Sequence, residues 1–268
     1  AGAVSRAVSV SSFSSAGSSS GDYAPVKGLF AFYSGPAQAR LHKMTTKEKV
    51  GQVFLFTCPS AGAVKAIDDY QPGGYCLTGR DFKGKTAAEV KKALASYQNS
   101  SRIPMFLACD EEGGTVVRIS SNPALSAQKF RSPQEVFRLG GMDGITSDTA
   151  RKAELMKSLG LNLNLAPVCD VSVDPSNFIY GRSFGQNAQQ TAEFVTASVK
   201  AYKGRNFACT LKHFPGYGNS ADTHAGVVRD SRSYQTFQQY DFLPFEAGIQ
   251  AGAPCVMVSH NIVESMDA

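Results

Sequence analysis

Short apolar runs alternate with longer amphipathic segments along most of this chain. Six of the runs are predicted to be strands, at residues 53–58, 74–78, 105–109, 161–169, 207–211 and 254–259. Their apolar positions are continuous rather than alternating, which is typical of parallel strands that helices cover. A hydroxyl residue followed three positions later by Glu indicates helix starts at residues 45–48, 86–89 and 132–135. Gly160 and Gly204 follow helical runs and fit the left-handed position after a helix.

Strands and helices that alternate at this spacing predict a parallel sheet with right-handed crossover connections. We therefore expect an α/β fold, namely a TIM-type (β/α) barrel with about six of its eight units present. In such a barrel the active face lies at the carboxyl ends of the strands, and Asp110, Lys212 and His213 all follow predicted strands closely. Six units leave two strand edges open, which is a liability for solubility and stability.

The first 25 residues differ from the rest of the chain. Nine of the first twenty residues are Ser and none is acidic, a composition typical of a linker or a disordered lead. We expect residues 1–25 to be such a lead and residues 26–268 to form the barrel, incomplete at its C-terminus. A Ser-rich tether would suit an exported protein held near a cell wall, while a cytoplasmic location stays open. The sequence has no run of 18 apolar residues, so we expect no transmembrane helix.

The charge of the chain limits the classes of possible partner, and its cysteines indicate whether disulfides form. The net charge of +5 is spread along the chain without a basic run, so we expect no nucleic-acid partner. All six cysteines lie in predicted strands or at their ends, where they serve as small apolar side chains. Neighbouring strands seldom offer disulfide geometry, so we expect free thiols.

Side chains suited to catalysis are most concentrated at residues 212–224, which read Lys-His-Phe-Pro-Gly-Tyr-Gly-Asn-Ser-Ala-Asp-Thr-His. A predicted strand ends in Lys212-His213, and Pro and Gly then force an irregular loop that ends in the pair Asp222 and His224. A carboxylate two residues from an imidazole can orient it and raise its pKa, as a general acid/base requires. The set His213, Asp222 and His224 also contains metal-ligand types, but Lys212 would repel a cation, so we expect no metal.

At this motif the sequence resembles the β-N-acetylglucosaminidases of glycoside hydrolase family 3. Further stretches are similar to that family in the same order, at residues 45–52, 109–118, 181–185 and 256–260. The resemblance implies that an Asp-His dyad on a mobile loop is the general acid/base, with Asp222 orienting His224. It also implies that the bound sugar is contacted by Asp110, Arg118, Arg182, Lys212 and His213. No cofactor or metal is implied.

One part of the family pattern is missing. The family's nucleophile is an aspartate after the seventh barrel strand, and nothing after His260 resembles such a strand. Retaining hydrolysis needs two groups about 5 Å apart, one that attacks and one that transfers protons. We expect the nucleophile beyond Ala268, so the chain is either a fragment of a longer enzyme or unable to perform this chemistry alone.

Three functions follow from the resemblance. The first is a retaining glycoside hydrolase that removes β-linked N-acetylglucosamine from peptidoglycan or chitin-type fragments. The second is a non-catalytic protein that binds N-acetylglucosamine or cell wall. The third is a β-glucosidase of the same family, which is disfavoured because those enzymes generally lack the Asp-x-His dyad. The partner in each case is a carbohydrate, while the aglycone, the choice of water or phosphate as acceptor, protein partners and the oligomeric state stay open.

Some candidate residues also have structural interpretations. At least one of Glu111 and Glu112 is expected to be a solvated loop charge. Arg182 could pair with a structural carboxylate such as Asp174. His260 ends an apolar strand, so we expect it in the core or behind the site rather than in catalysis.

Overall fold

The computed structural model describes residues 31–218 and 220–266. The chain separates into two compact units, Ala1–Lys43 and Met44–Ala268. In the first unit, the described residues form a 3-10 turn η1 (Ala31–Tyr33) and a helix α1 (Ser34–His42). The predicted Ser-rich lead at residues 1–25 lies outside the described residues, so this domain boundary stays a prediction.

The second unit is built on one parallel sheet. Its strands in the described residues are β1 (Leu55–Thr57), β2 (Gly74–Leu77), β3 (Phe106–Cys109), β4 (Leu163–Asn164), β5 (Ala208–Phe214) and β7 (Cys255–Val258). They pair in the order β1-β2-β3-β4-β5-β7, and every pairing is parallel. This sheet confirms the α/β fold and the six strand–helix units of an open TIM-type barrel.

The strands differ from the prediction mainly in length. β4 covers two residues of the predicted run 161–169, and beyond it Val168 and Lys212 form an isolated bridge. Pro167 lies between the end of β4 and Val168 in the sequence and has no N–H to donate to a sheet ladder. A second, two-stranded parallel sheet pairs β6 (Arg229–Asp230) with β8 (Ile262–Val263). Two-residue strands are too short to show an apolar pattern, so the sequence did not predict them.

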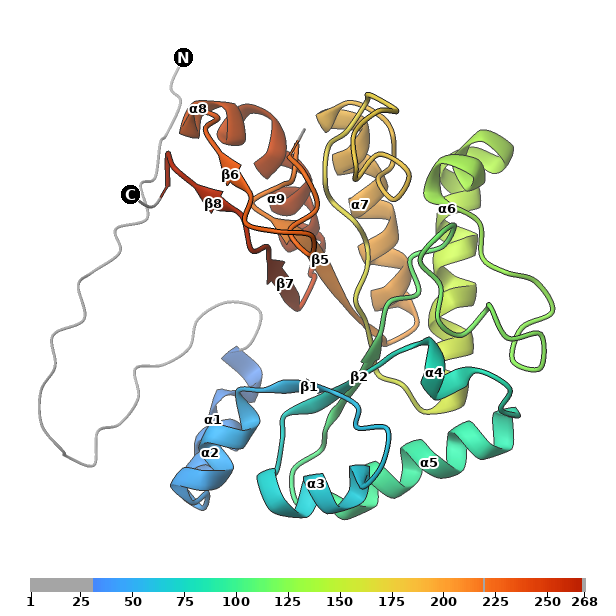
Figure 1. The fold of residues 1–268 in the computed structure, drawn as a ribbon, viewed down its shortest axis with the longest axis vertical. Coiled ribbons are helices and arrows are strands. Elements are labelled where there is room, and N and C mark those ends of the chain that lie inside the picture. Colours follow the sequence, from blue (N-terminus) through green and yellow to red (C-terminus); the bar gives the residue numbers. More distant parts are fainter. Residues whose placement is uncertain (1–30, 219, 267–268) are drawn as a thin grey trace, which may run out of the picture. The chain divides into compact units, whose positions relative to one another are not determined.

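Helices connect the strands of the sheet. In the described part of the second unit they are α2 (Thr46–Gln52), α3 (Ala63–Tyr70), α4 (Gly79–Phe82), α5 (Ala87–Ser100), α6 (Pro133–Leu159), α7 (Ala188–Gly204), α8 (Tyr234–Thr236), a π-helical turn η2 (Phe237–Asp241) and α9 (Phe242–Ala251). Consecutive long helices pack on one another, α5 on α6, α6 on α7 and α7 on α9 (Figure 1). This row of helices covers the outside of the sheet, which explains the continuous apolar strands.

The helix starts follow the predicted capping chemistry. Thr45 and Thr86 each accept the N–H of the Glu three residues later, and that Glu accepts the N–H of the cap in return. Ser132 also caps its helix by accepting the N–H of Glu135. Glu135 does not return the bond to Ser132 as in a capping box, and its carboxylate lies 3.5 Å from Arg131 instead.

The two predicted helix-ending glycines behave differently. Gly160 follows α6 with φ 101°, the left-handed conformation that glycine adopts without strain. The prediction for Gly204 is wrong, because α7 includes this residue as its last. The left-handed residue beyond α7 is Asn206, with φ 50°. Asn tolerates this conformation better than most residues with a side chain.

A single large apolar cluster lies between the sheet and its helices. Phe184 and Phe194 stack within it at a centroid distance of 4.6 Å, and Leu211 of β5 and Phe245 of α9 are also buried in it. All six cysteines are free. Among the described residues no helix has the length and apolar character that a membrane span requires.

The sheet has two open edges in the described residues. β1 pairs with β2 alone and β7 pairs with β5 alone. Large apolar side chains are exposed on these outer strands, with Leu55 and Val256 each 40% exposed and Val258 66% exposed. The predicted pair of open strand edges is therefore present.

Candidate active site

Six of the seven predicted site residues line one hollow of about 330 Å³. They come from the carboxyl ends of strands or from the segments that follow, and they are Asp110, Arg118, Arg182, Lys212, His213 and His224. The seventh, Asp222, hydrogen-bonds His224 at the rim. The sheet therefore brings together residues that lie up to 114 positions apart in the sequence.

A buried network of charges forms the floor of this hollow. The Lys212 ammonium lies 2.6 Å from Oδ1 of Asp110 and 2.7 Å from Oε1 of Glu112. Arg182 donates to both oxygens of Glu112, at 3.0 Å from Nε and 2.7 Å from Nη2. Arg118 approaches Asp110 from the other side, at 3.9 Å. Two carboxylates are thus held by three cations.

The pairing keeps the buried groups charged. Burial raises the pKa of the Glu112 carboxyl, but Lys212 and Arg182 outweigh burial and lower it to about 2. Burial lowers the pKa of Lys212, but Glu112 and Asp110 outweigh burial and raise it above its ordinary value. Breaking such a pair would leave an unpaired buried charge, which is strongly unfavourable.

His213 is oriented by a carboxylate that the sequence analysis missed. Oδ2 of the fully buried Asp170 lies 2.8 Å from Nδ1 of His213, and Asp170 also accepts the backbone N–H groups of His213 and Tyr217. Nδ1 therefore carries the proton, and Nε2 accepts from Nη2 of Arg182 at 3.3 Å. Asp170 directly follows the apolar run 161–169, and this position at a strand end was the signal for it.

The expectation that Glu111 or Glu112 is a solvated loop charge is wrong, because both are buried. Glu112 holds the two cations described above. Glu111 accepts the backbone N–H groups of Arg118, Ile119 and Ser120 at 2.7 to 3.1 Å, and the Ser120 hydroxyl as well. The buried carboxylate thereby folds the loop after β3 so that it presents Arg118 to the hollow.

Two further structural interpretations also fail. Arg182 pairs with Glu112 rather than with Asp174, which instead accepts from the backbone and hydroxyl of Ser176. His260 is exposed and lines the hollow, so it does not lie in the core. Its neighbour Ser259 donates its backbone N–H to the Phe214 carbonyl, which continues the pairing of β7 with β5.

The Asp222–His224 pair forms a second group of the site. Oδ1 of Asp222 lies 2.8 Å from Nδ1 of His224 and also accepts its backbone N–H at 2.9 Å. That backbone N–H, followed by the imidazole, lowers the pKa of Asp222. Nδ1 is therefore the protonated nitrogen, and Nε2 is left to exchange protons with a ligand. The His224 side chain is 77% exposed, in contrast to the buried network.

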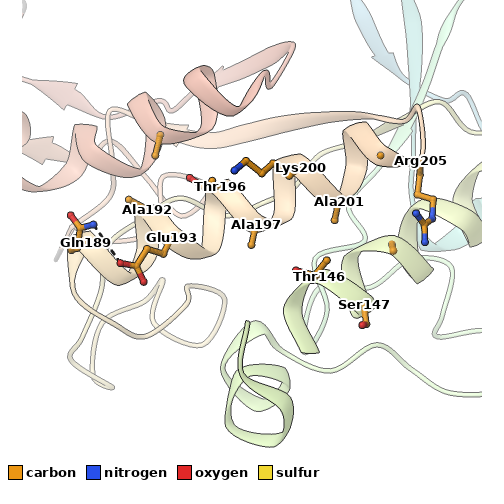
Figure 2. A pocket seen from close by; sticks show the side chains of 13 residues that line it. Thr146, Ser147, Gln189, Ala192, Glu193, Thr196, Ala197, Lys200, Ala201 and Arg205 are labelled. Carbon is orange, nitrogen blue, oxygen red and sulfur yellow. Dashed lines mark hydrogen bonds between the residues drawn. The ribbon is translucent and has the colours of Figure 1, made fainter. Parts of the chain in front are cut away.

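A larger hollow of about 710 Å³ lies elsewhere, on the outer face of α6 and α7. Figure 2 shows side chains of α7 along it, among them Gln189, Glu193 and Lys200, together with Thr146 of α6. Small side chains make up most of the lining, and none of its residues is a histidine. The histidines and the paired charges that could act on a substrate lie instead in the smaller hollow at the strand ends.

Comparisons with known proteins show which family the chain is similar to. The sequence profile described as "Glycosyl hydrolase family 3 N terminal domain" matches residues 45–268. The chain is 34% identical over 207 residues to "Beta-hexosaminidase A" of Pseudoalteromonas piscicida, covering 75% of this chain and 35% of that protein. It is 32% identical over 190 residues to "Beta-hexosaminidase" of Xanthomonas axonopodis pv. citri, covering 70% of this chain and 56% of that protein.

A solved structure is similar as well. It is the glycoside hydrolase family 3 β-N-acetylglucosaminidase from Paenibacillus sp. str. FPU-7, with a TM-score of 0.74 and 27% identity. The similarity covers 83% of this chain and 43% of that one. The chain thus spans about a third to just over half the length of these curated relatives. The profile match over residues 45–268, together with the fold, shows that the chain belongs to glycosyl hydrolase family 3.

Proposed function

We propose that this chain supplies the sugar-binding face and the general acid/base of a retaining β-N-acetylhexosaminidase. The observation that carries the proposal is that the exposed Asp222–His224 pair and the buried Lys212–Glu112–Arg182 network meet at one hollow. Relatives named beta-hexosaminidase support the substrate class, a β-linked N-acetylglucosaminide of peptidoglycan or chitin type.

The buried network is suited to bind sugar hydroxyls. Lys212 has three N–H donors, and its two carboxylate partners leave one for a ligand. Asp110 accepts from Lys212 through Oδ1, which leaves Oδ2 as an acceptor between Arg118 and the hollow. Charged partners make such hydrogen bonds strong, and the ion pairs hold the groups in place before the sugar arrives. In this proposal Arg118, Arg182 and His213 complete the sugar-binding set.

In the proposed reaction, His224 protonates the oxygen of the leaving group through Nε2. It then removes a proton from the water that releases the sugar, while Asp222 keeps the imidazole in the required tautomer. A carboxylate must attack the anomeric carbon on the opposite face of the ring. We propose that this nucleophile is an aspartate beyond Ala268, which agrees with the greater length of the relatives.

The alternative of a non-catalytic sugar-binding protein is favoured by one observation. The buried network closes on itself through its own ion pairs, and among the described residues no hydrogen bond or ion pair joins it to Asp222 or His224, although the charge of Arg182 helps to lower the pKa of Asp222. Binding of N-acetylglucosamine could therefore take place without turnover. The third candidate, a β-glucosidase, is disfavoured by the Asp222–His224 pair itself.

The decisive variant is His224→Ala in the protein as its gene encodes it. We expect turnover of an aryl β-N-acetylglucosaminide with a poor leaving group to fall by roughly 10²- to 10⁴-fold, because a general acid/base contributes about this much. A 2,4-dinitrophenyl substrate needs little protonation, so its first step should fall far less. Asp222→Asn should act in the same direction.

Sugar binding provides the control for these variants. The affinity for N-acetylglucosamine, measured by calorimetry, should stay close to that of the wild type, because neither residue belongs to the buried network. Full activity of His224→Ala on the poor leaving group would refute the assignment. Binding without any wild-type turnover would favour the non-catalytic alternative, and faster hydrolysis of the matching aryl β-glucoside would favour the β-glucosidase.

A further inference from the structure

Arg232 lies at the base of the segment that carries Asp222 and His224, and it contacts three parts of the chain. Its guanidinium bonds both carboxylate oxygens of Asp230, at 2.7 to 3.0 Å. It bonds both oxygens of Asp241 through Nη1, at 2.9 and 3.1 Å. Nη2 also donates to the Gly216 carbonyl at 2.9 Å. Gly216 precedes the Asp222–His224 segment and Asp230 follows it, so one side chain joins its two ends.

The partners of Arg232 are buried and their charges are paired. The side chains of Asp230 and Asp241 are 2% and 3% exposed. Burial raises the pKa of Asp241 to about 6, with Arg232 acting against the rise, so this carboxyl is ionised at neutral pH. The guanidinium also lies 4.2 Å from the centroid of the Phe237 ring, a favourable cation–π distance.

Two glycines leave the space that the contacts of Arg232 occupy. Gly216 and Gly218 have φ 119° and 52°, which side chains rarely adopt. A Cβ on Gly216 would lie 2.4 Å from Oδ1 of Asp241, and one on Gly218 would lie 2.4 Å from Nη1 of Arg232. The π-helical turn η2 brings Phe237 and Asp241 to the same guanidinium, and π-helical turns are frequent at functional sites.

The same contacts lead into the Asp222–His224 segment. The Ser220 hydroxyl donates to Oδ2 of Asp230, the oxygen that Arg232 also binds. At the other end, the Tyr217 hydroxyl lies 2.6 Å from the hydroxyl of Thr223, which is the residue between Asp222 and His224. The Tyr217 backbone N–H in turn bonds Asp170, which orients His213. The segment is thus tied to the sugar-binding network at its start and to Arg232 at its end.

We propose that Arg232 is a positioning residue for the general acid/base: by joining Gly216, Asp230 and Asp241 it fixes the place from which His224 meets the leaving oxygen. The inference rests on the proposed function, because it assigns Arg232 its effect through His224. Arg is required because its planar fork can bond two carboxylates and a carbonyl at once, whereas Lys offers a point charge on a flexible stem.

The test is Arg232→Lys, measured on aryl β-N-acetylglucosaminides with poor and good leaving groups. Misplacing a catalytic group by about 1 Å can cost roughly 100-fold in rate. We expect kcat/KM to fall by about 10- to 100-fold on the poor leaving group and much less on the 2,4-dinitrophenyl substrate. A variant with less folded protein would instead lose both activities equally. Hydrogen exchange of the backbone amides at residues 220–228 should also become faster.

Two further variants complete the experiment. Arg229→Lys is the matched control, because Arg229 lies three residues away in an exposed pair with Glu264 at 3.4 Å and should leave the leaving-group ratio unchanged. If Arg232→Lys does not fold, Asp241→Asn removes one charge while keeping the shape of the side chain, and we expect the same selective loss.

Failure of this inference differs from failure of the proposed function. A folded Arg232→Lys protein with a wild-type ratio of the two activities would overturn the positioning role. If the wild type turns over neither substrate, the proposed function fails, and exchange at residues 220–228 alone decides whether Arg232 holds the segment. Unchanged exchange in that case overturns the inference.

Discussion

At the scale of single residues, Glu112 is a buried carboxylate whose charge is balanced by two cations. Its side chain is 2% exposed and is the shared partner of Lys212 and Arg182. The carboxylate thereby sets the distance between the two cations that we propose to bind the sugar. Removing its charge would leave two buried cations with one fewer partner, which is costly in a poorly solvated place.

This predicts a pH-dependent effect of Glu112→Gln. The pKa of Glu112 is about 2 in the folded chain and 4.5 ordinarily, so the carboxylate stabilises the fold fully above about pH 4.5. The contribution, on the order of 3 kcal/mol, is lost as the pH falls from 4.5 towards 2. We expect the difference in unfolding free energy between wild type and variant to be large at pH 7 and to shrink by pH 3.

Chemical denaturation at pH 7, 5 and 3 measures this difference. Glu135→Gln is the control, because Glu135 forms a solvent-exposed pair at 3.5 Å and such pairs contribute little. A difference for Glu112→Gln that stays constant from pH 7 to pH 3 would contradict the linkage.

Two of the predicted site residues have a local signal, and the other five were predicted from the family resemblance. Asp222 and His224 lie two positions apart and orient each other, so the chain pattern alone contains their interaction. Glu112 and Asp170 depend on partners 100 and 43 positions away, Lys212 and His213. Their burial follows from the sheet that brings those strands together, which no local pattern shows. The roles assigned to the site residues stay predictions until variants are measured.

At the scale of elements, the predictions that depend on neighbouring residues were right, and those that depend on tertiary packing were wrong. The capping residues Thr45, Thr86 and Ser132 were predictable because each cap lies within three residues of its partner. The end of α7 and the short β4 were not, because packing and sheet pairing decide them. Close packing is also visible at Gly248 of α9, where a Cβ would lie 2.7 Å from both Cδ atoms of Leu211 and 2.9 Å from Cγ1 of Val195.

We therefore predict that Gly248→Ala destabilises the protein. Replacing a helical Gly by Ala ordinarily stabilises by about 0.5–1 kcal/mol, but here the added methyl group would press α9 away from β5. Overpacking of a core typically costs about 1–3 kcal/mol. Thermal and chemical unfolding would measure the change. The matched control is Gly204→Ala at the end of α7, where nothing lies within 4 Å of the added Cβ. Equal effects of the two substitutions would refute the packing argument.

At the scale of the whole molecule, the sheet of the second unit exposes apolar side chains on both outer strands. Exposed strand edges with apolar side chains favour pairing with another chain. Val258 of β7 is the most exposed of those on the outer strands. The parallel order of the strands was predictable from their alternation with helices, whereas the exposure of each edge residue required the structure.

We predict that the 268-residue chain associates at high concentration and that Val258→Lys weakens this association. A charge on an edge strand opposes pairing with a second edge. Sedimentation or light scattering as a function of concentration measures the effect. Val227→Lys is the control, because Val227 is 82% exposed but belongs to neither sheet. A similar decrease with both variants would mean that added charge, rather than the strand edge, controls association.

The way Arg232 joins Gly216 to Asp230 has a consequence for how the sequence of the segment between them can vary. Because one side chain secures both ends of the intervening segment, residues of that segment other than Asp222 and His224 can vary in sequence while its entry and exit points stay fixed. In the proposed function, substitutions there would alter which aglycone fits without disturbing the pocket that we propose to bind the sugar. A protein engineer could accordingly exchange that stretch between relatives of equal segment length, provided that the two anchor points, Arg232 and the Asp222–His224 pair are retained.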